Sequence, residues 1–315
     1  MFRCRMENMQ LFGGSSNQDL VKKISELGVG VGQVDISKFA NDEKRVSVGK
    51  GDLPVGRQGG VAAILQSFSK PVDEHIIEFC LLADALTRSG YSELVGVVPW
   101  LGYSKQDKVF LPGEALSAKV IAQIIQTTKI KKLITFDLHN RAITGFFDIP
   151  VVELSAKPLF RDYYEKKIGD NKAEYVVVAP DEGAVKASSY FARELGLAIA
   201  YMDKRRDLTT GEVRVSGMTG DVSGRRVIIV DDMIVTGSTM MESAAFLKTH
   251  GAVSVSVAAT HHLYLPGVQE KLEMSEIDEV VVSDTVQLSS ESAGQKADSK
   301  LKVLSVAGLI VDELR

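Results

Sequence analysis

The stretch of sequence that decides the fold is residues 226–239, which read RVIIVDDMIVTGST. Its apolar part, Val227–Val230, consists of β-branched residues only and predicts a strand buried on both faces. Two carboxylates, Asp231 and Asp232, follow that run directly. A loop of hydroxyls and glycine, Thr236–Thr239, comes next and leads into a helical pattern. The stretch therefore predicts a strand, a pair of acids and a loop at a helix N-terminus.

This order of elements suits a bound sugar phosphate. Carboxylates accept hydrogen bonds from vicinal ribose hydroxyls, while loop N–H groups, hydroxyls and the helix dipole hold a 5′-phosphate. Gly237 lets the backbone approach that phosphate closely. The plainer interpretation is a strand and a helix joined by a capped turn, because Ser and Thr favour N-cap positions. Two adjacent acids beside a buried strand argue against it, since they are costly unless something pairs with them.

Length and composition limit the class of protein. A chain of 315 residues suggests two domains or one large one, and 45% hydrophobic with 25% charged residues is ordinary for a soluble globular protein. The net charge of −4 disfavours a general nucleic-acid surface, so an anionic substrate needs a local cluster of cations. Cys4 and Cys80 lack metal-type spacing, and no apolar run has the length of a membrane span. Without a hydrophobic signal core, the sequence predicts a cytoplasmic protein.

Strands and helices alternate along the chain. The predicted strands are 9–12, 61–65, 94–100, 132–136, 175–179, 197–202, 227–230, 253–260 and 279–283, and the predicted helices are 18–27, 71–89, 117–127, 185–195 and 240–250. Such alternation predicts parallel sheets covered by helices on both faces. Pro150 interrupts the pattern, so we expect a first domain over residues 1–150 and a second over residues 151–315.

Three polar clusters follow predicted strands, where parallel sheets gather their ligands. Lys105 and Gln106 offer a cation and an amide after one strand. His139 follows another and can ligate a metal or contact a phosphate. Asp181 follows a third and can hold Mg²⁺ directly or through water. Taken alone, Lys105 and Gln106 also fit an ordinary solvated loop, and His139 also fits a structural histidine.

A fourth cluster is cationic. Lys204–Arg206 places three consecutive cations after the predicted strand 197–202 and before a hairpin-like segment, residues 209–212. The cluster predicts a flap that closes over a polyphosphate, where each charge-assisted hydrogen bond contributes about 1.5–3 kcal/mol. An ordinary surface patch is the other interpretation.

Taken together, these motifs resemble those of the ribose-phosphate diphosphokinases, also called phosphoribosyl pyrophosphate synthetases. The resemblance covers almost the whole chain and runs through residues 12–17, 39–43, 103–108, 137–147, 180–184, 204–206, 231–239 and 301–307. It implies an α/β fold of two type I phosphoribosyltransferase-like domains, each a mainly parallel sheet flanked by helices, and allows the last helix to pack on the N-terminal domain. Enzymes of this family move the β,γ-diphosphoryl group of ATP to the C1 hydroxyl of ribose 5-phosphate, leave AMP and require Mg²⁺.

The resemblance also implies a role for each cluster. ATP would be bound by Phe39, Asn41, Asp42, Glu43, Lys105, Gln106 and His139, with adenine held across a dimer interface. Ribose 5-phosphate would be bound by Arg206, Asp231, Asp232, Val235, Thr236, Gly237, Ser238 and Thr239. Catalysis would fall to Lys204 and Arg206, and the Mg²⁺ site to His139 and Asp181. The implied assembly is a homo-oligomer based on dimers, with the hexamer as one form, and neither nucleic acid nor membrane is an expected partner.

Several positions depart from the common family pattern. Lys105 stands where arginine is usual, Asn41 and Val235 stand where aspartate is common, and Ala142 replaces a glutamine. The loop PDEGAVKA, which starts at Pro180, is one residue shorter than the common form. Two other functions therefore stay open. A non-catalytic regulatory homologue of the synthetase is favoured by these departures, and a base-salvage phosphoribosyltransferase needs the ribose-phosphate motif alone.

Overall fold

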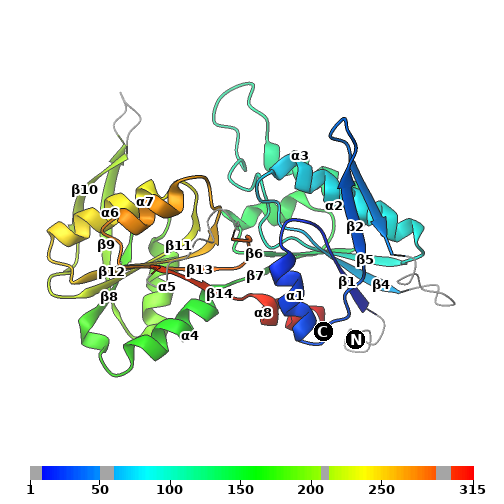
Figure 1. Ribbon diagram of the computed structural model, residues 1–315. Coiled ribbons are helices and arrows are strands. Elements are labelled where there is room, and N and C mark those ends of the chain that lie inside the picture. The colour runs from blue at the N-terminus through cyan, green and yellow to red at the C-terminus, as the bar shows by residue number, and fades with distance from the viewer. Residues whose placement is uncertain (1–8, 50–59, 207–212, 289–298) are drawn as a thin grey trace. The chain divides into compact units, whose positions relative to one another are not determined.

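The computed structural model describes residues 9–49, 60–206, 213–288 and 299–315, except the side chains of 204–206 and 213–216 (Figure 1). The chain folds into two compact units. The first comprises Met1–Ser155, Thr285–Gln287 and Ser305–Arg315, and the second comprises Ala156–Asp284 and Leu288–Leu304. No helix among the described residues is both long enough and apolar enough to cross a membrane.

This division differs from the boundary expected after residue 150. The strand β7, Val151–Leu154, pairs in parallel with β6, Lys132–Phe136, and so completes the sheet of the first unit. Pro150 does interrupt the ladder, but only as the residue that precedes β7, and its carbonyl accepts a hydrogen bond from Leu133 N at 3.0 Å. Because a proline is tolerated at the start of an edge strand, the pattern break marks a strand start and not the domain boundary.

The first unit is built on a five-stranded parallel sheet in the order β1-β4-β5-β6-β7. The other strands of this sheet are β1 (Met9–Gly13), β4 (Val61–Leu65) and β5 (Glu93–Val97). The helices of the unit are α1 (Gln18–Glu26), α2 (Val72–Arg88), α3 (Ser117–Thr127), η3 (Arg141–Phe146) and α8 (Ala307–Leu314). A separate hairpin is formed by β2 (Val34–Lys38) and β3 (Lys44–Val48). Helices α2 and α3 cover one face, and α1 and α8 cover the other (Figure 1). The last helix of the chain thus belongs to this unit, where it packs against α1.

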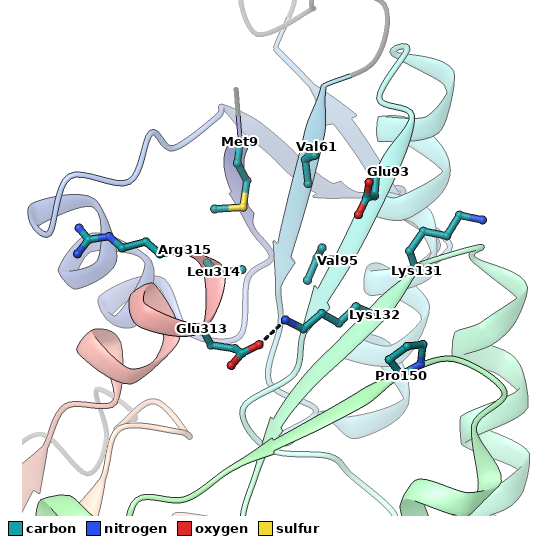
Figure 2. Close-up of a pocket in the computed structure, with 10 residues that line it drawn as sticks. All are labelled: Met9, Val61, Glu93, Val95, Lys131, Lys132, Pro150, Glu313, Leu314 and Arg315. Carbon is teal, nitrogen blue, oxygen red and sulfur yellow. Dashed lines mark hydrogen bonds and ion pairs between the residues drawn. The ribbon is translucent and has the colours of Figure 1, made fainter. Parts of the chain in front are cut away.

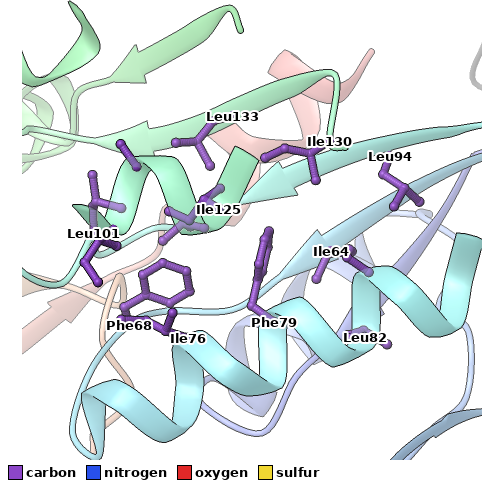
Figure 3. Close-up of a cluster of buried hydrophobic side chains, with 14 of the residues drawn as sticks. Ile64, Phe68, Ile76, Phe79, Leu82, Leu94, Leu101, Ile125, Ile130 and Leu133 are labelled. Atoms are coloured by element: carbon purple, nitrogen blue, oxygen red, sulfur yellow. The ribbon is translucent and has the colours of Figure 1, made fainter. Parts of the chain in front are cut away.

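The core of the first unit explains why α2 forms where it does. Its buried residues include Ile76, Phe79 and Leu82, whose spacing of three places them on one helical face. Figure 3 shows these side chains packed towards the sheet, which supplies Ile64 from β4. The rings of Phe68 and Phe79 meet edge to face with centroids 5.7 Å apart, a favourable geometry for aromatic pairs.

The second unit holds a seven-stranded sheet in the order β10-β9-β8-β11-β12-β13-β14, parallel except for the edge strand β10. The strands are β8 (Tyr175–Ala179), β9 (Ala198–Arg206), β10 (Val213–Thr219), β11 (Arg226–Ile234), β12 (Ser254–His262), β13 (Glu279–Ser283) and β14 (Leu301–Leu304), and the helices are α4 (Lys157–Ile168), η4 (Lys172–Glu174), α5 (Val185–Leu195), α6 (Ser238–Thr249) and α7 (Val268–Met274). Helices α6 and α7 lie on one face and α4 and α5 on the other (Figure 1). The predicted α/β class with helix-covered parallel sheets is confirmed.

One correction concerns the stretch that opened the sequence argument. The predicted strand ended at Val230, but β11 continues to Ile234, so Asp231 and Asp232 lie inside the strand and not after it. The extension follows from its neighbour, because β12 is equally long and pairs Ile234 with His262. Helix α6 also begins at Ser238, two residues before the predicted start.

Candidate substrate site

The loop between β11 and α6 forms a cradle at the carboxyl edge of the second sheet. Gly237 is the N-cap of α6 and no side chain caps the helix, so its first N–H groups are not satisfied by a capping side chain. Thr236 Oγ1 and Ser238 Oγ lie 3.0 Å apart, and both residues are exposed. Uncapped N–H groups beside two hydroxyls, at the positive end of a helix, are suited to a phosphate.

Gly237 is required by this geometry. Its φ of +73° lies in the left-handed region that L side chains rarely adopt. A methyl group there would also lie 3.2 Å from Leu272 Cδ2, a side chain of α7. The left-handed φ and the contact with α7 explain the glycine itself, and its close approach to a ligand stays a prediction.

Three carboxylates gather next to this cradle. Asp232 N donates to Asp231 Oδ1 at 2.8 Å. Burial, then the charge of Asp232 and, less strongly, that of Asp181 raise the pKa of Asp231 to about 7. Asp181 lies just after β8, which pairs directly with β11. The cluster therefore concentrates negative charge where a cation or a set of hydroxyl donors would relieve it.

Asp181 also has a local structural role. Its Oδ1 accepts a hydrogen bond from Ala184 N at 3.0 Å, which closes the turn before α5. Among the described residues, no group of three or more His, Cys, Asp or Glu side chains has the arrangement of a metal site. The role of Asp181 as a metal ligand stays a prediction.

The cationic cluster is only partly described. Its backbone lies in β9, and the antiparallel register opposes Lys204 to Val215 and Arg206 to Val213. The side chains of Lys204 and Arg206 lie outside the described part of the chain, as do residues 207–212, onto which the predicted hairpin tip falls. Their catalytic roles stay predictions.

In the first unit, the residues expected to bind adenine form the tip of the β2–β3 hairpin. Phe39 N donates to Glu43 O at 2.9 Å and Asp42 N donates to Phe39 O at 3.0 Å, while Asn41 Oδ1 accepts from Glu43 N at 3.4 Å. Asp42 has a φ of +65°. This tight turn leaves the Phe39 side chain 55% exposed, so its ring is presented for stacking.

The other two clusters of the first unit come together at the carboxyl edge of its sheet. Asn140 Nδ2 donates to Asp107 Oδ2 at 2.6 Å, which joins the loop after β6 to the loop that carries Lys105. Lys105 and His139 are exposed. Gln106 has a structural partner, because its Oε1 accepts from Ser117 Oγ at 2.7 Å at the start of α3.

A buried residue that the sequence analysis did not single out supports the hairpin. Glu78 of α2 is fully buried and pairs with Lys44 of β3. It also accepts hydrogen bonds from Ser15 Oγ at 2.8 Å and Gln66 Nε2 at 2.7 Å. The sequence did contain a signal for this residue, because Glu78 is a carboxylate on the apolar face of α2, directly before Phe79.

The described pockets lie away from these loops. A pocket of about 560 Å³ opens at the amino ends of the first sheet (Figure 2), and a second of about 410 Å³ at the amino ends of the second sheet. Val61 and Val95 form part of the wall of the first pocket, beside the Lys132–Glu313 ion pair. Neither is lined by any of the predicted site residues, because those follow the carboxyl ends of their strands.

The fold and these loops define a class of proteins, the α/β proteins with two phosphoribosyltransferase-like units. Residues 9–128 match a family model described as the N-terminal domain of ribose phosphate pyrophosphokinase, and residues 211–315 match the phosphoribosyl synthetase-associated domain. The chain belongs to the ribose-phosphate pyrophosphokinase family, which confirms the resemblance found in the sequence.

Individual relatives support this membership over the full length. A ribose-phosphate pyrophosphokinase of Wolinella succinogenes is 35% identical over 311 residues, which are 98% of this chain and 96% of the relative. One from Helicobacter pylori is 34% identical over 315 residues, covering 100% and 94%. The crystal structure of phosphoribosylpyrophosphate synthetase from Mycobacterium smegmatis superimposes with a TM-score of 0.87 at 31% identity and covers 98% of both chains.

Proposed function

We propose that this chain catalyses the transfer of the β,γ-diphosphoryl group of ATP to the C1 hydroxyl of ribose 5-phosphate, with release of AMP. The observation that carries the proposal is the paired Asp231 and Asp232 next to the uncapped N-terminus of α6. Carboxylates accept hydrogen bonds from ribose hydroxyls, and the N–H groups with Thr236 and Ser238 take the 5′-phosphate. Val235 and Thr239 complete this loop in the proposal.

The reaction mainly requires the protein to position the two substrates and to stabilise negative charge. A ribose held at both its hydroxyls and its phosphate has its C1 hydroxyl fixed, so that it can approach the β-phosphorus in line with the departing AMP oxygen. Lys204 and Arg206, on the strand β9 of the same sheet, are proposed to stabilise the transferred group. Phe39, Asn41, Asp42, Glu43, Lys105, Gln106 and His139 are proposed to bind ATP.

Magnesium is part of the proposal. Burial, and then the charges of Asp232 and Asp181, raise the pKa of Asp231, and carboxylate oxygens are ligands that Mg²⁺ prefers. We propose that Asp181 and His139 hold the ion, which neutralises phosphate charge when bound. A homo-oligomer completes the proposal, together with a cytoplasmic location, where small soluble substrates are available.

The proposal is tested by AMP formation from ATP and Mg²⁺ with and without ribose 5-phosphate, followed by phosphorus NMR of the product. Ribose-dependent AMP together with a new C1 diphosphate signal is the expected result. Nucleotide binding without AMP in well-folded protein would instead favour the regulatory homologue. Diphosphate release that depends on an added base would favour a salvage phosphoribosyltransferase.

A further inference from the structure

The second unit holds a buried polar cluster at the carboxyl end of β12, which the proposed function leaves unused. Tyr264 N donates to His262 Nδ1 at 2.9 Å, and the two rings stack with centroids 4.1 Å apart. Tyr264 adopts a left-handed conformation with a φ of +47°, which is uncommon for a bulky residue. The hydrogen bond and the stack therefore stabilise a sharp turn where the chain leaves the sheet towards α7.

The protonation state of His262 follows from its surroundings. Burial lowers the pKa of His262 to about 4, and the nearby Gln269 side chain opposes this only in part. The ring is therefore neutral near pH 7. Because Nδ1 accepts a hydrogen bond, the single ring proton is on Nε2. This Nε2–H is completely buried and has no hydrogen-bond partner among the described residues.

A matching acceptor lies in α7. Gln269 Nε2 donates to Glu273 Oε1 at 2.8 Å, and this fixes the amide orientation because a carboxylate can only accept. Gln269 Oε1 is then the atom left for another donor, and it too is buried without a hydrogen-bond partner in the described part of the chain. A buried donor and a buried acceptor are costly to leave apart, so a small shift of α7 that joins them is favoured.

The same helix packs against the phosphate loop. A methyl group at Gly237 would lie 3.2 Å from Leu272 Cδ2 and 3.6 Å from Val268 Cγ1, and both side chains belong to α7. Leu263 N donates to Ile234 O at 3.0 Å, which ties the end of β12 to the end of β11. A shift of α7 is thereby transmitted to the backbone of the loop that precedes α6.

We propose that His262 is a positioning residue of the phosphate loop: after this small shift its Nε2–H donates to Gln269 Oε1, and the bond seats α7 against Gly237. The inference rests on the proposed function in taking ribose 5-phosphate as the ligand of this loop. The bond contributes to the affinity for the sugar phosphate and leaves the chemical step unchanged, because it acts where the 5′-phosphate is held.

The test uses His262→Asn, whose side-chain oxygen can still accept from Tyr264 N but which lacks the Nε2–H. Titration calorimetry with ribose 5-phosphate should give a Kd about fivefold higher, the effect of one net hydrogen bond. The KM for ribose 5-phosphate should rise by the same factor, with kcat and the KM for ATP unchanged. Gln269→Leu should give a similar change, and the double variant should bind as tightly as either single variant. His250→Asn, at an exposed histidine of the same unit, is the control and should match the wild type.

An unchanged Kd in His262→Asn would overturn the positioning role, as would effects that multiply in the double variant or a fall in kcat at constant KM. If His262→Asn does not fold, as judged by circular dichroism, Gln269→Leu at a half-buried helix position carries the same comparison. Wild-type protein that binds ribose 5-phosphate but forms no AMP would contradict the proposed activity alone, since the calorimetric Kd values still decide the role of His262.

Discussion

The ammonium group of Lys44 and the carboxylate of Glu78 form an ion pair beneath the β2–β3 hairpin, and their side chains are only 9% and 0% exposed. Burial by itself would raise the pKa of Glu78, but the Lys44 and Ser15 hydrogen bonds outweigh it and lower that pKa. Ser15 belongs to the loop after β1. One buried carboxylate thus joins α2, the hairpin and this loop, so the expected adenine-binding tip rests on an internal charge pair.

Replacement of Lys44 by methionine should therefore be strongly destabilising. It would leave Glu78 charged, buried and without its cation, a change that typically costs about 3–5 kcal/mol. Urea unfolding at pH 7 measures this loss. Lys38→Met is the matched control, because Lys38 pairs with the partly exposed Glu74 at 2.8 Å and exposed pairs contribute little to stability. Equal losses of unfolding free energy in the two variants would show that burial does not increase the cost of breaking the Lys44–Glu78 pair.

Asp231→Asn should make the metal-free protein more stable at neutral pH. Burial and the neighbouring acids raise the pKa of Asp231 from 3.8 to about 7, so between these values the folded protein binds more protons than the unfolded chain. Its contribution to stability therefore falls as the pH rises from about 4 to about 7. Asparagine removes this dependence because it carries no charge. The free energy of unfolding of the variant should exceed that of the wild type by at most about 4 kcal/mol above pH 7 and by almost nothing near pH 4.

Thermal or urea unfolding of both proteins in the presence of a chelator, at several pH values, measures this difference. Asp221→Asn is the control, because Asp221 is exposed and accepts a local hydrogen bond from Ser223 N. A stability difference for Asp231→Asn that is the same at pH 4 and pH 8 would contradict the assigned cause, since both the cost of burying the charge and the repulsion require ionised carboxylates.

Most strands of the two sheets could be predicted because buried parallel strands are continuous apolar runs, whereas the edge strands β7 and β10 were not predicted. YVVVA of β8 is an example, with every residue buried. The hairpin β2–β3 escaped prediction, since its strands VDISK and KRVSV are short and nowhere fully buried. The predicted end of β11 was wrong for a related reason. Its length is set by pairing with β12, which no local pattern at Asp231 and Asp232 reveals.

The candidate site was predictable as a set of loops but not as a set of contacts. Its loops follow strand ends, and in each unit the parallel topology brings those ends to one edge of the sheet. The proximity of Asp181 to Asp231 depends on β8 pairing with β11 although β9 and β10 intervene in the sequence. The contact of Glu78 with Lys44 is likewise set by tertiary packing, so only the structure reveals it.

Gly237→Ala should weaken binding of ribose 5-phosphate. Alanine would have to adopt a φ of +73° and would meet Leu272 at 3.2 Å, so the loop backbone would shift. Misplaced positioning groups reduce rates by up to about a hundredfold, and we expect the KM for ribose 5-phosphate to rise about tenfold or more. Gly224→Ala is the matched control, with a φ of +69° and no atom within 4 Å. Both variants should lose similar stability from strain, about 1–2 kcal/mol, and only Gly237→Ala should change the KM.

Lys204→Ala should reduce turnover by at least about a hundredfold while leaving the fold intact. The proposed role of Lys204 is to stabilise negative charge on the diphosphoryl group in transfer, and the loss of one such donor typically costs a factor of about 10²–10³. The initial rate of AMP formation at saturating ATP and ribose 5-phosphate measures the effect, with circular dichroism as the check on folding. Lys172→Ala, at an exposed position of η4 in the same unit, controls for the loss of one positive charge and should keep wild-type turnover. If Lys204→Ala and Lys172→Ala turn over at the same rate, Lys204 has no catalytic role and the transferred group must be stabilised by other cations of the chain.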